Sequence, residues 1–142
     1  DRLTNMIKPR KIFMGEKDYQ QLYLVKKYLQ KKNVGTIISC KTVRDNYKLA
    51  LSSRNFHLNK KELNKARLIS KNLNEFKKKL TKMQDIQKSI LLKKKEYENL
   101  GNTKIEYLEL RNKLNLKKTL KLKNSKIFIA YYINNVRLID NF

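Results

Sequence analysis

The chain has 142 residues, of which 40% are hydrophobic, and its formal net charge at pH 7 is +23. This length and this hydrophobic share predict one modest folded core and exclude a disordered tail. With one histidine, His57, and one cysteine, Cys40, a single chain can build neither a disulfide framework nor a His/Cys metal cluster. We expect a cytoplasmic protein, because no apolar run is long enough to span a membrane and no secretory leader is visible.

The positive charge alone favours a polyanion partner such as nucleic acid. The lysines are nevertheless spread along the whole chain, and only 7 of the 35 basic residues are arginines, the residues whose forked guanidinium reads base edges. A chain rich in lysine and asparagine also arises from codon bias in an AT-rich genome. A lysine-rich nucleic-acid-binding module is therefore an alternative reading rather than the leading one.

The first segments in chain order indicate part of an α/β fold. Residues 1–10 have the pattern of a helix end that is stopped by Pro9. A short apolar strand follows over 11–15, and Gly15 ends it with a tight turn. In open α/β sheets, ligands bind beyond the carboxyl ends of the strands, so this turn is a candidate site.

A helix is predicted over about 18–32, and its first turn offers free amides to an anion. Asp18 and Gln21 have the spacing of a capping box, while Asn33 and Gly35 are predicted to end the helix.

A second β-prone run over 36–40 completes a strand, helix, strand unit. Such a unit is only part of a parallel sheet, because further parallel strands must cover its edges. Residues 1–42 are therefore predicted to be the remnant of a separate α/β domain.

A polar segment follows in which Ser52, Ser53 and Arg54 place two hydroxyls and a guanidinium side by side. These groups can donate to several phosphate oxygens at once, although such a string also occurs in ordinary polar turns. His57 is most simply a surface residue, because no carboxylate or nucleophile is placed to partner it.

The rest of the chain predicts a small α+β domain over 43–142. Two helices are expected, over 60–79 and 82–99. Each begins with the spacing of a capping box, Asn59 with Glu62 and Thr81 with Gln84. Three strands of an antiparallel sheet are expected at 104–111, 126–133 and 136–140, with a two-residue turn at Asn134-Asn135.

Five segments together resemble the pantothenate synthetase (pantoate–β-alanine ligase) family over essentially the whole chain. They are Gly15-Glu-Lys-Asp-Tyr-Gln-Gln-Leu22, Thr42-Val-Arg44, Leu49-Ala-Leu-Ser-Ser-Arg-Asn55, Ile105-Glu-Tyr-Leu-Glu-Leu-Arg111 and Arg137-Leu-Ile-Asp-Asn141. The resemblance implies an ATP-dependent ligase of the nucleotidyltransferase superfamily. Such an enzyme joins pantoate to AMP with release of pyrophosphate, and β-alanine then displaces AMP to give pantothenate.

The resemblance also implies a domain plan and partners. Residues 1–42 would be the last part of a Rossmann-like domain that binds ATP and pantoate, and 43–142 would be a C-terminal lid domain. ATP would arrive with Mg²⁺, and no residue of this chain is implied as a metal ligand. The full-length enzymes of the family are homodimers, and neither a membrane nor nucleic acid is an implied partner.

Four site residues are implied in the first part of the chain. Gly15 would approach the nucleoside with its backbone, Asp18 would bond the ribose hydroxyls, Lys17 would meet the phosphates as a catalytic group, and Gln21 would hold pantoate. Without the resemblance, Asp18 and Gln21 are most simply helix caps, and Lys17 is one lysine among many.

Five more site residues are implied in the second part. Val43 and Leu51 would flank adenine, and Ser52, Ser53 and Arg54 would form a mobile catalytic loop that closes over the triphosphate. Adenylation builds negative charge on the phosphates, so fixed cations and hydroxyl donors at that point lower the barrier.

The sequence departs from the family in three places. Tyr47-Lys48 stands where the family usually has Asp-Gly, which we expect to stiffen the loop, and Leu51 stands in place of a methionine. The family's N-terminal His-x-Gly-His signature is missing. We therefore expect the chain to be the C-terminal part of a longer enzyme, one subunit of a split enzyme or a degenerate remnant, with little ligase activity alone. A packing or assembly domain without chemistry is a further alternative.

Overall fold

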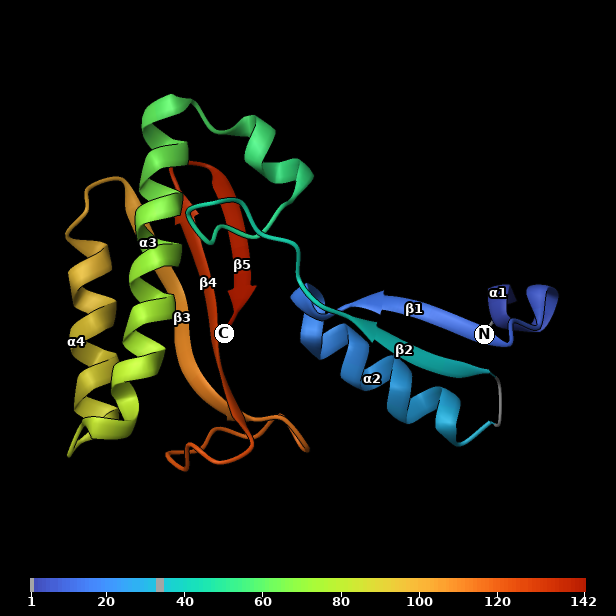
Figure 1. Cartoon of the computed structure of the whole chain (residues 1–142). Coiled ribbons are helices and arrows are strands. Elements are labelled where there is room, and N and C mark those ends of the chain that lie inside the picture. Colours follow the sequence, from blue (N-terminus) through green and yellow to red (C-terminus); the bar gives the residue numbers. More distant parts are fainter. Residues whose placement is uncertain (1, 33–34) are drawn as a thin grey trace. The chain divides into compact units, whose positions relative to one another are not determined.

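The computed structural model describes residues 2–32 and 35–142, and the chain divides into two compact units, Asp1–Thr42 (unit 1) and Val43–Phe142 (unit 2). Figure 1 shows the helices and strands of each unit. The predicted roles of residues 1–42 in binding ATP and pantoate and of 43–142 as a lid remain predictions.

Unit 1 is a βαβ motif preceded by a short helix. Its elements are helix α1 (Arg2–Ile7), strand β1 (Lys11–Gly15), helix α2 (Tyr19–Gln30) and strand β2 (Thr36–Cys40). The two strands pair in parallel, as the predicted order of strand, helix and strand requires. Helix α2 buries Leu22 and Leu29, which are seven positions apart and so lie on one face of the helix.

The connection into β2 turns at Gly35. This residue has a φ of +60°, in the left-handed region that glycine adopts without steric cost. A Cβ atom at Gly35 would meet the carbonyl oxygen of Pro9 far inside the ordinary contact distance, so the turn requires glycine. Asn33, the other residue predicted to end the helix, lies outside the described residues.

The start of α2 differs from the sequence prediction. A 3₁₀ turn over Glu16–Asp18 precedes the helix, and the Asp18 side chain accepts no capping hydrogen bond. The predicted capping box of Asp18 and Gln21 is therefore wrong. The reason is the backbone of Asp18, with φ −94° and ψ 57°, which lacks the extended conformation that an N-cap residue takes.

Unit 2 is an antiparallel sheet with two helices and confirms the predicted α+β class. Helix α3 spans Lys60–Lys79, helix α4 spans Ile86–Glu98, and the strands are β3 (Thr103–Asn112), β4 (Ser125–Ile133) and β5 (Val136–Asn141). The sheet order is β3-β4-β5, with a register shift between Ile105 and Tyr107. Asn134 turns the β4–β5 hairpin with a φ of 48°, as predicted for this pair of asparagines.

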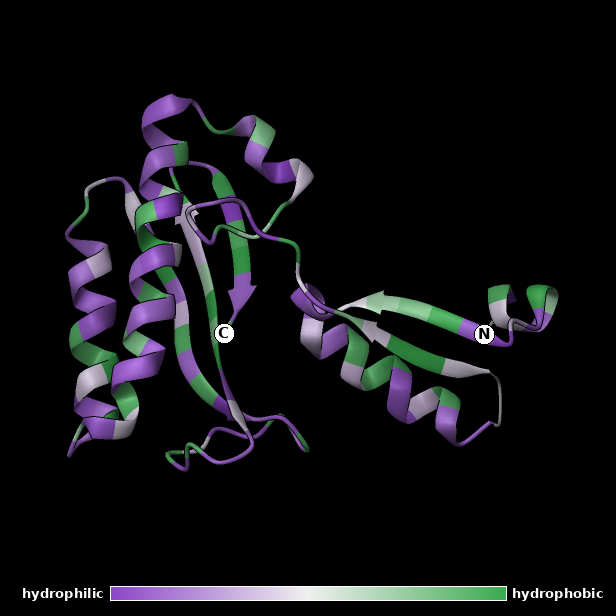
Figure 2. Cartoon of the chain, in the orientation of Figure 1, coloured by the Kyte–Doolittle hydropathy of each residue, from purple (hydrophilic) through white to green (hydrophobic). Residues whose placement is uncertain are grey.

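The hydrophobic core of unit 2 lies between the helices and the sheet. Hydrophobic and hydrophilic residues alternate in bands along α3 and α4 (Figure 2). The buried side chains of α3 recur every three or four positions, at Ala66, Ile69, Leu73 and Phe76, and they join buried residues of all three strands in one cluster. Tyr97 of α4 is fully buried in this cluster, and its hydroxyl donates to the Ile69 carbonyl at 3.4 Å.

The two helices of unit 2 differ in how well their caps are predicted. Asn59 and Glu62 form the complete predicted capping box. The cap predicted at Thr81 and Gln84 is wrong, because α3 continues into a 3₁₀ turn over Leu80–Lys82 and α4 begins only at Ile86. Asp85 is the actual cap, and its carboxylate accepts from the Lys88 amide at 2.9 Å. Aspartate is a stronger N-cap residue than threonine, but the prediction used only the spacing of the capping box and not this preference.

The caps give a direct test of this assignment. Asn59→Ala and Asp85→Ala should each lower the free energy of unfolding by about 1 kcal/mol, because each leaves a helix amide without its acceptor. Thr81→Ala is the matched control and should cost less than about 0.5 kcal/mol. Urea denaturation followed by circular dichroism measures all three. Equal losses for Thr81→Ala and Asp85→Ala would contradict the observed start of α4.

Candidate functional site

The candidate residues of unit 1 lie at the carboxyl end of β1. Gly15 ends the strand, Lys17 and Asp18 lie in the 3₁₀ turn, and Gln21 lies in the first turn of α2. A Cβ atom at Gly15 would have nothing within 4 Å, and its φ of −69° suits any residue. Neither packing nor backbone strain therefore requires glycine here, so the space beside it is open to a ligand.

The charged groups of this corner differ in exposure, since the Lys17 side chain is only 22% exposed. The Lys17 Nζ lies 3.7 Å from an Asp18 carboxylate oxygen, and about half of the Asp18 side chain is exposed. Burial raises the pKa of the neighbouring Tyr19 hydroxyl, and the Glu16 carboxylate adds to the rise. Tyr19 therefore stays neutral at physiological pH, and the turn presents the ammonium of Lys17 beside the carboxylate of Asp18.

The candidate residues Val43 and Leu51 of unit 2 lie side by side on a small hairpin, residues 43–51, which we call the 43–51 hairpin. The Leu51 amide donates to the Val43 carbonyl at 3.0 Å, next to an antiparallel bridge between Arg44 and Ala50. The exposed fractions of Val43 and Leu51 are 67% and 56%, whereas Ala50 is buried. Two exposed aliphatic side chains therefore form one apolar surface, as an aromatic ring would require.

The base of this hairpin is held by Arg44, which lies in a segment that resembles the family but has no predicted role. Its guanidinium donates to both carboxylate oxygens of Asp140, at 2.6 and 2.8 Å, and to the Asn141 carbonyl at 2.9 Å. It also donates to the Lys48 carbonyl at 2.8 Å and lies 4.5 Å from the centre of the Phe142 ring. The side chain of Asp140 is only 4% exposed, so this ion pair is largely removed from water.

The turn of the 43–51 hairpin contains the departure from the family at Tyr47-Lys48. Lys48 has a φ of 71°, the left-handed region in which a side chain is strained and glycine is not. The Asp45 carboxylate accepts from the amides of Tyr47 and Leu49, at 2.9 and 3.0 Å. The turn therefore keeps a glycine-like backbone although glycine is missing.

The candidate residues Ser52, Ser53 and Arg54 follow the hairpin directly. Ser52 caps a 3₁₀ turn over Ser53–His57, and its hydroxyl accepts from the Arg54 amide at 3.3 Å. Arg54 is exposed and its Nη1 donates to the Arg137 carbonyl at 3.1 Å. The side chain of Arg137 pairs instead with Glu106, and this hydrogen bond lowers the pKa of the Glu106 carboxyl. The structure thus presents a hydroxyl and a guanidinium at the surface, directly after the apolar pair in the chain.

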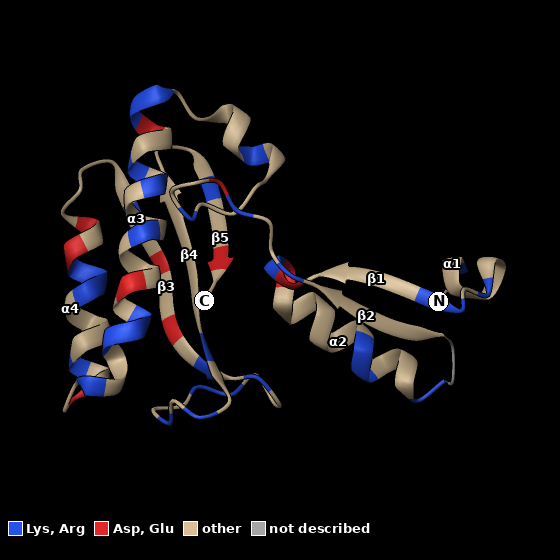
Figure 3. Ribbon diagram, viewed as in Figure 1, with Lys and Arg blue, Asp and Glu red and all other residues tan. Residues whose placement is uncertain are grey.

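Other features of the molecule do not mark the site. Lysines and arginines are distributed over α3, α4 and the segment between β3 and β4 (Figure 3). No helix in the described part of the chain is long and apolar enough to cross a membrane. Among the residues at 2–32 and 35–142, no cluster of three His, Cys, Asp or Glu side chains could hold a metal ion.

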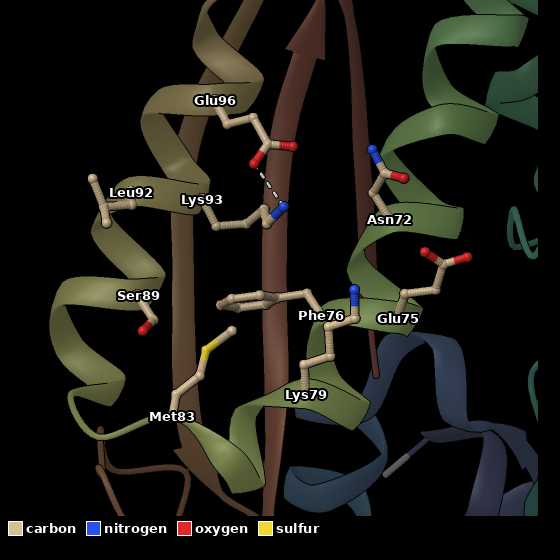
Figure 4. A pocket seen from close by; sticks show the side chains of 9 residues that line it. All are labelled: Asn72, Glu75, Phe76, Lys79, Met83, Ser89, Leu92, Lys93 and Glu96. Carbon is tan, nitrogen blue, oxygen red and sulfur yellow. Dashed lines mark hydrogen bonds and ion pairs between the residues drawn. The ribbon is translucent and has the colours of Figure 1, made fainter.

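A groove of about 480 Å³ lies between α3 and α4 (Figure 4). Phe76 and Met83 contribute apolar walls, and Lys93 pairs with Glu96 at 2.6 Å along α4. None of the residues predicted for the site lines this groove.

By architecture, the chain is an α+β protein with a βαβ unit and a unit of two helices on a three-stranded antiparallel sheet. It belongs to the pantoate-beta-alanine ligase family, whose model matches residues 1–142. The predicted resemblance to pantothenate synthetases is thereby confirmed.

Curated relatives agree with this assignment. The pantothenate synthetase of Flavobacterium psychrophilum is 37% identical over 144 residues, which cover 99% of this chain and 51% of the relative. That of Francisella tularensis subsp. novicida is 35% identical over 147 residues, which cover 99% of this chain and 46% of the relative. The chain therefore spans about half the length of the curated relatives it matches.

Solved structures agree in fold. The pantothenate synthetase of Thermus thermophilus superposes with a TM-score of 0.88 at 24% identity, covering 99% of this chain and 52% of that one, and this likeness shows the fold alone. The pantoate-beta-alanine ligase of Francisella tularensis, solved in complex with beta-gamma ATP and beta-alanine, superposes with a TM-score of 0.74 at 32% identity. The match covers 99% of this chain and 46% of the Francisella tularensis chain.

The ion pair at the base of the hairpin gives a stability test. Arg44→Met should lower the free energy of unfolding by about 3 to 5 kcal/mol, because it removes the guanidinium that pairs with both oxygens of the buried Asp140 carboxylate. Lys94→Met removes an exposed pair with Glu98, 3.8 Å away, and should cost no more than about 0.5 kcal/mol. Urea denaturation compares the two, and similar losses would contradict the structural role of the Arg44 pair.

The strained turn gives an opposite test. Lys48→Gly should raise the free energy of unfolding by up to about 1 kcal/mol, because glycine removes the left-handed strain and loses only part of that gain to chain entropy. Lys121→Gly, at an exposed loop residue without positive φ, should not stabilise the chain. Thermal unfolding measures both. A loss of stability in Lys48→Gly would show that the lysine backbone is unstrained.

Proposed function

We propose that this chain is the C-terminal part of an ATP-dependent ligase that condenses pantoate with β-alanine to give pantothenate, AMP and pyrophosphate. The family match over residues 1–142 carries the proposal. Further support comes from the exposure of most of the implied site residues, although Lys17 and Ser52 are half-buried. The Francisella tularensis relative, solved with beta-gamma ATP and beta-alanine, supports ATP and β-alanine as substrates.

The reaction has two steps in this proposal. The pantoate carboxylate attacks the α-phosphorus of ATP, the bond to the pyrophosphate oxygen breaks, and pyrophosphate leaves. The β-alanine amine then attacks the acyl carbon of pantoyl adenylate, loses a proton and expels AMP. Both steps require that the reactants be oriented and that the adenylate be kept from water.

Unit 2 is proposed to act as the lid that meets the nucleotide. Val43 and Leu51 would flank adenine through the apolar surface that they form on the 43–51 hairpin. Ser52, Ser53 and Arg54 would donate to the phosphates, where negative charge grows during adenylation. Because these donors follow Leu51 directly in the chain, one short segment would contact both the base and the phosphates.

Unit 1 is proposed to be the last part of a Rossmann-like nucleotidyltransferase domain. Gly15 would leave room for the nucleoside, Asp18 would accept from the ribose hydroxyls and Lys17 would contact the phosphates. Gln21 would hold pantoate from the first turn of α2. The failure of Asp18 to cap its helix supports its role, because the carboxylate is left exposed to a ligand.

The remaining parts of the site are proposed to lie in the half of the relatives that this chain does not match. The histidines of the His-x-Gly-His signature would come from there, because this sequence has one histidine, His57, which is exposed on the 3₁₀ turn. Mg²⁺ would enter bound to the ATP phosphates as part of the substrate. We extend the homodimer and the cytoplasmic location of the family to the complete enzyme. The family match favours this reading over a nucleic-acid-binding module.

A chimaera tests the proposal. The chain is joined to the half of the Flavobacterium psychrophilum relative that it does not match, and AMP release is followed with pantoate, β-alanine and MgATP. The 142-residue chain alone should show little turnover, and the chimaera should be active. Arg54→Ala should lower kcat by about 100-fold, as expected when one donor to the developing charge is lost.

Lys71→Ala is the control, because Lys71 is an exposed residue of α3 with no proposed role. It should leave turnover unchanged. Turnover by the chain alone, an inactive but folded chimaera, or full activity of Arg54→Ala would each contradict the proposal. The last result would instead favour a support domain without chemistry.

A further inference from the structure

Arg67 of α3 contacts the tip of the 43–51 hairpin in two ways. Its Nε donates to the Asp45 carboxylate at 2.8 Å, and its guanidinium carbon lies 4.8 Å from the centre of the Tyr47 ring. The side chains of Arg67 and Asp45 are 30% and 18% exposed, so the pair is partly shielded from water. Arg67, Asp45 and Tyr47 therefore form a clamp, which we call the Arg67 clamp.

The Arg67 clamp acts on the backbone of the turn through Asp45. One carboxylate oxygen of Asp45 accepts from Arg67, and the other accepts from the amides of Tyr47 and Leu49. The same carboxylate thus connects the turn to the helix. Any displacement of the turn relative to α3 must break the ion pair, the ring contact or these amide hydrogen bonds.

Helix α3 is a firm support for this clamp. Its N-terminus is closed by a complete capping box, and Arg67 lies between two residues of its buried face, Ala66 and Ile69, which are 0% and 1% exposed. The Cα of Arg67 is therefore fixed by the core of unit 2. The hairpin itself buries only Leu49 and Ala50 within its length.

The turn needs such support at this sequence. Lys48 holds a left-handed backbone that glycine would adopt without strain. Tyr47, with 54% exposure, would otherwise present most of a large ring to water. The two residues that replace the family's usual Asp-Gly pair are thus a strained residue and the aromatic surface on which Arg67 stacks.

We propose that Arg67 is a positioning residue that fixes the 43–51 hairpin and so sets the affinity of the enzyme for the adenine of ATP. The inference rests on the proposed function, because it requires Val43 and Leu51 to hold the base. Arg44 anchors the base of the hairpin to β5, and Arg67 anchors its tip to α3. The apolar surface of Val43 and Leu51 is then held ready to receive a flat ring, so that ordering the hairpin adds no cost when the nucleotide binds.

The first test uses the 142-residue chain and needs no activity. Arg67→Met keeps an unbranched side chain and removes the guanidinium. Hydrogen exchange at the Leu49 and Leu51 amides, followed by NMR, should become about tenfold faster. Arg111→Met removes a guanidinium that pairs with Glu109 at 2.5 Å on the sheet, and should leave both amides unchanged.

The second test uses the active chimaera. Arg67→Met should raise KM for ATP about tenfold, with kcat and KM for pantoate within twofold of the parent. A variant that only loses folded protein would have a smaller active fraction. Its apparent kcat would then fall, and its KM for ATP would stay unchanged. Arg67→Lys should recover part of the ATP affinity, because it keeps the charge opposite Asp45 and loses the flat stacking surface.

The outcomes separate the two proposals. Unchanged exchange at Leu49 and Leu51 would overturn the Arg67 clamp whatever the enzyme does. Faster exchange with unchanged KM for ATP would overturn the positioning role. A parent chimaera that folds without turnover would overturn the proposed function, and the positioning role with it, while the exchange data would still decide the clamp.

Discussion

The ion pair between Arg44 and Asp140 is the constraint on which the exposed loop of unit 2 depends. A carboxylate that is 4% exposed would be costly without a partner, and the bidentate guanidinium compensates that cost only because its other donors are also satisfied. The acceptors are the carbonyls of Asn141 and Lys48, one on the sheet and one in the hairpin turn. A single side chain thus joins β5 to a segment that contributes little to the core. The loop that carries the candidate site residues therefore begins from a fixed point.

The two units support their site residues with different strength. In unit 2, buried side chains from both helices and all three strands form one cluster, so the elements beneath the loop are rigid. In unit 1, α2 buries only Leu22 and Leu29, and Phe13 of the two-stranded parallel sheet is 65% exposed. Parallel sheets are normally covered on both faces, and this exposure is what the proposal that unit 1 belongs to a larger sheet expects. The corner at Gly15 is consequently held by local geometry, whereas the loop at Ser52 is held by long-range contacts.

This difference explains what the sequence could predict. The helices and strands follow from apolar periods of two and of three to four residues, and the complete cap at Asn59 follows from local chemistry. The caps predicted at Asp18 and Thr81 were wrong because spacing does not reveal that each of these residues lies within a 3₁₀ turn. The pairing of Arg44 with Asp140 spans 96 positions, and no local pattern encodes it. Arg44 and Asp140 both lie in segments that resemble the family, but their pairing is visible only in the fold.

The long-range contacts also bear on how the loop can move in the proposed ligase. Leu51 and Ser52 are consecutive, so the proposed wall for adenine and the proposed first donor to the phosphates cannot move independently. Arg44 holds one end of this segment, and the bond from Arg54 to the Arg137 carbonyl holds the other, both on β5. Bending within the loop would break these contacts. The side chain of Arg54 donates to the Arg137 carbonyl, so the proposed contact with a phosphate would require it to exchange that acceptor.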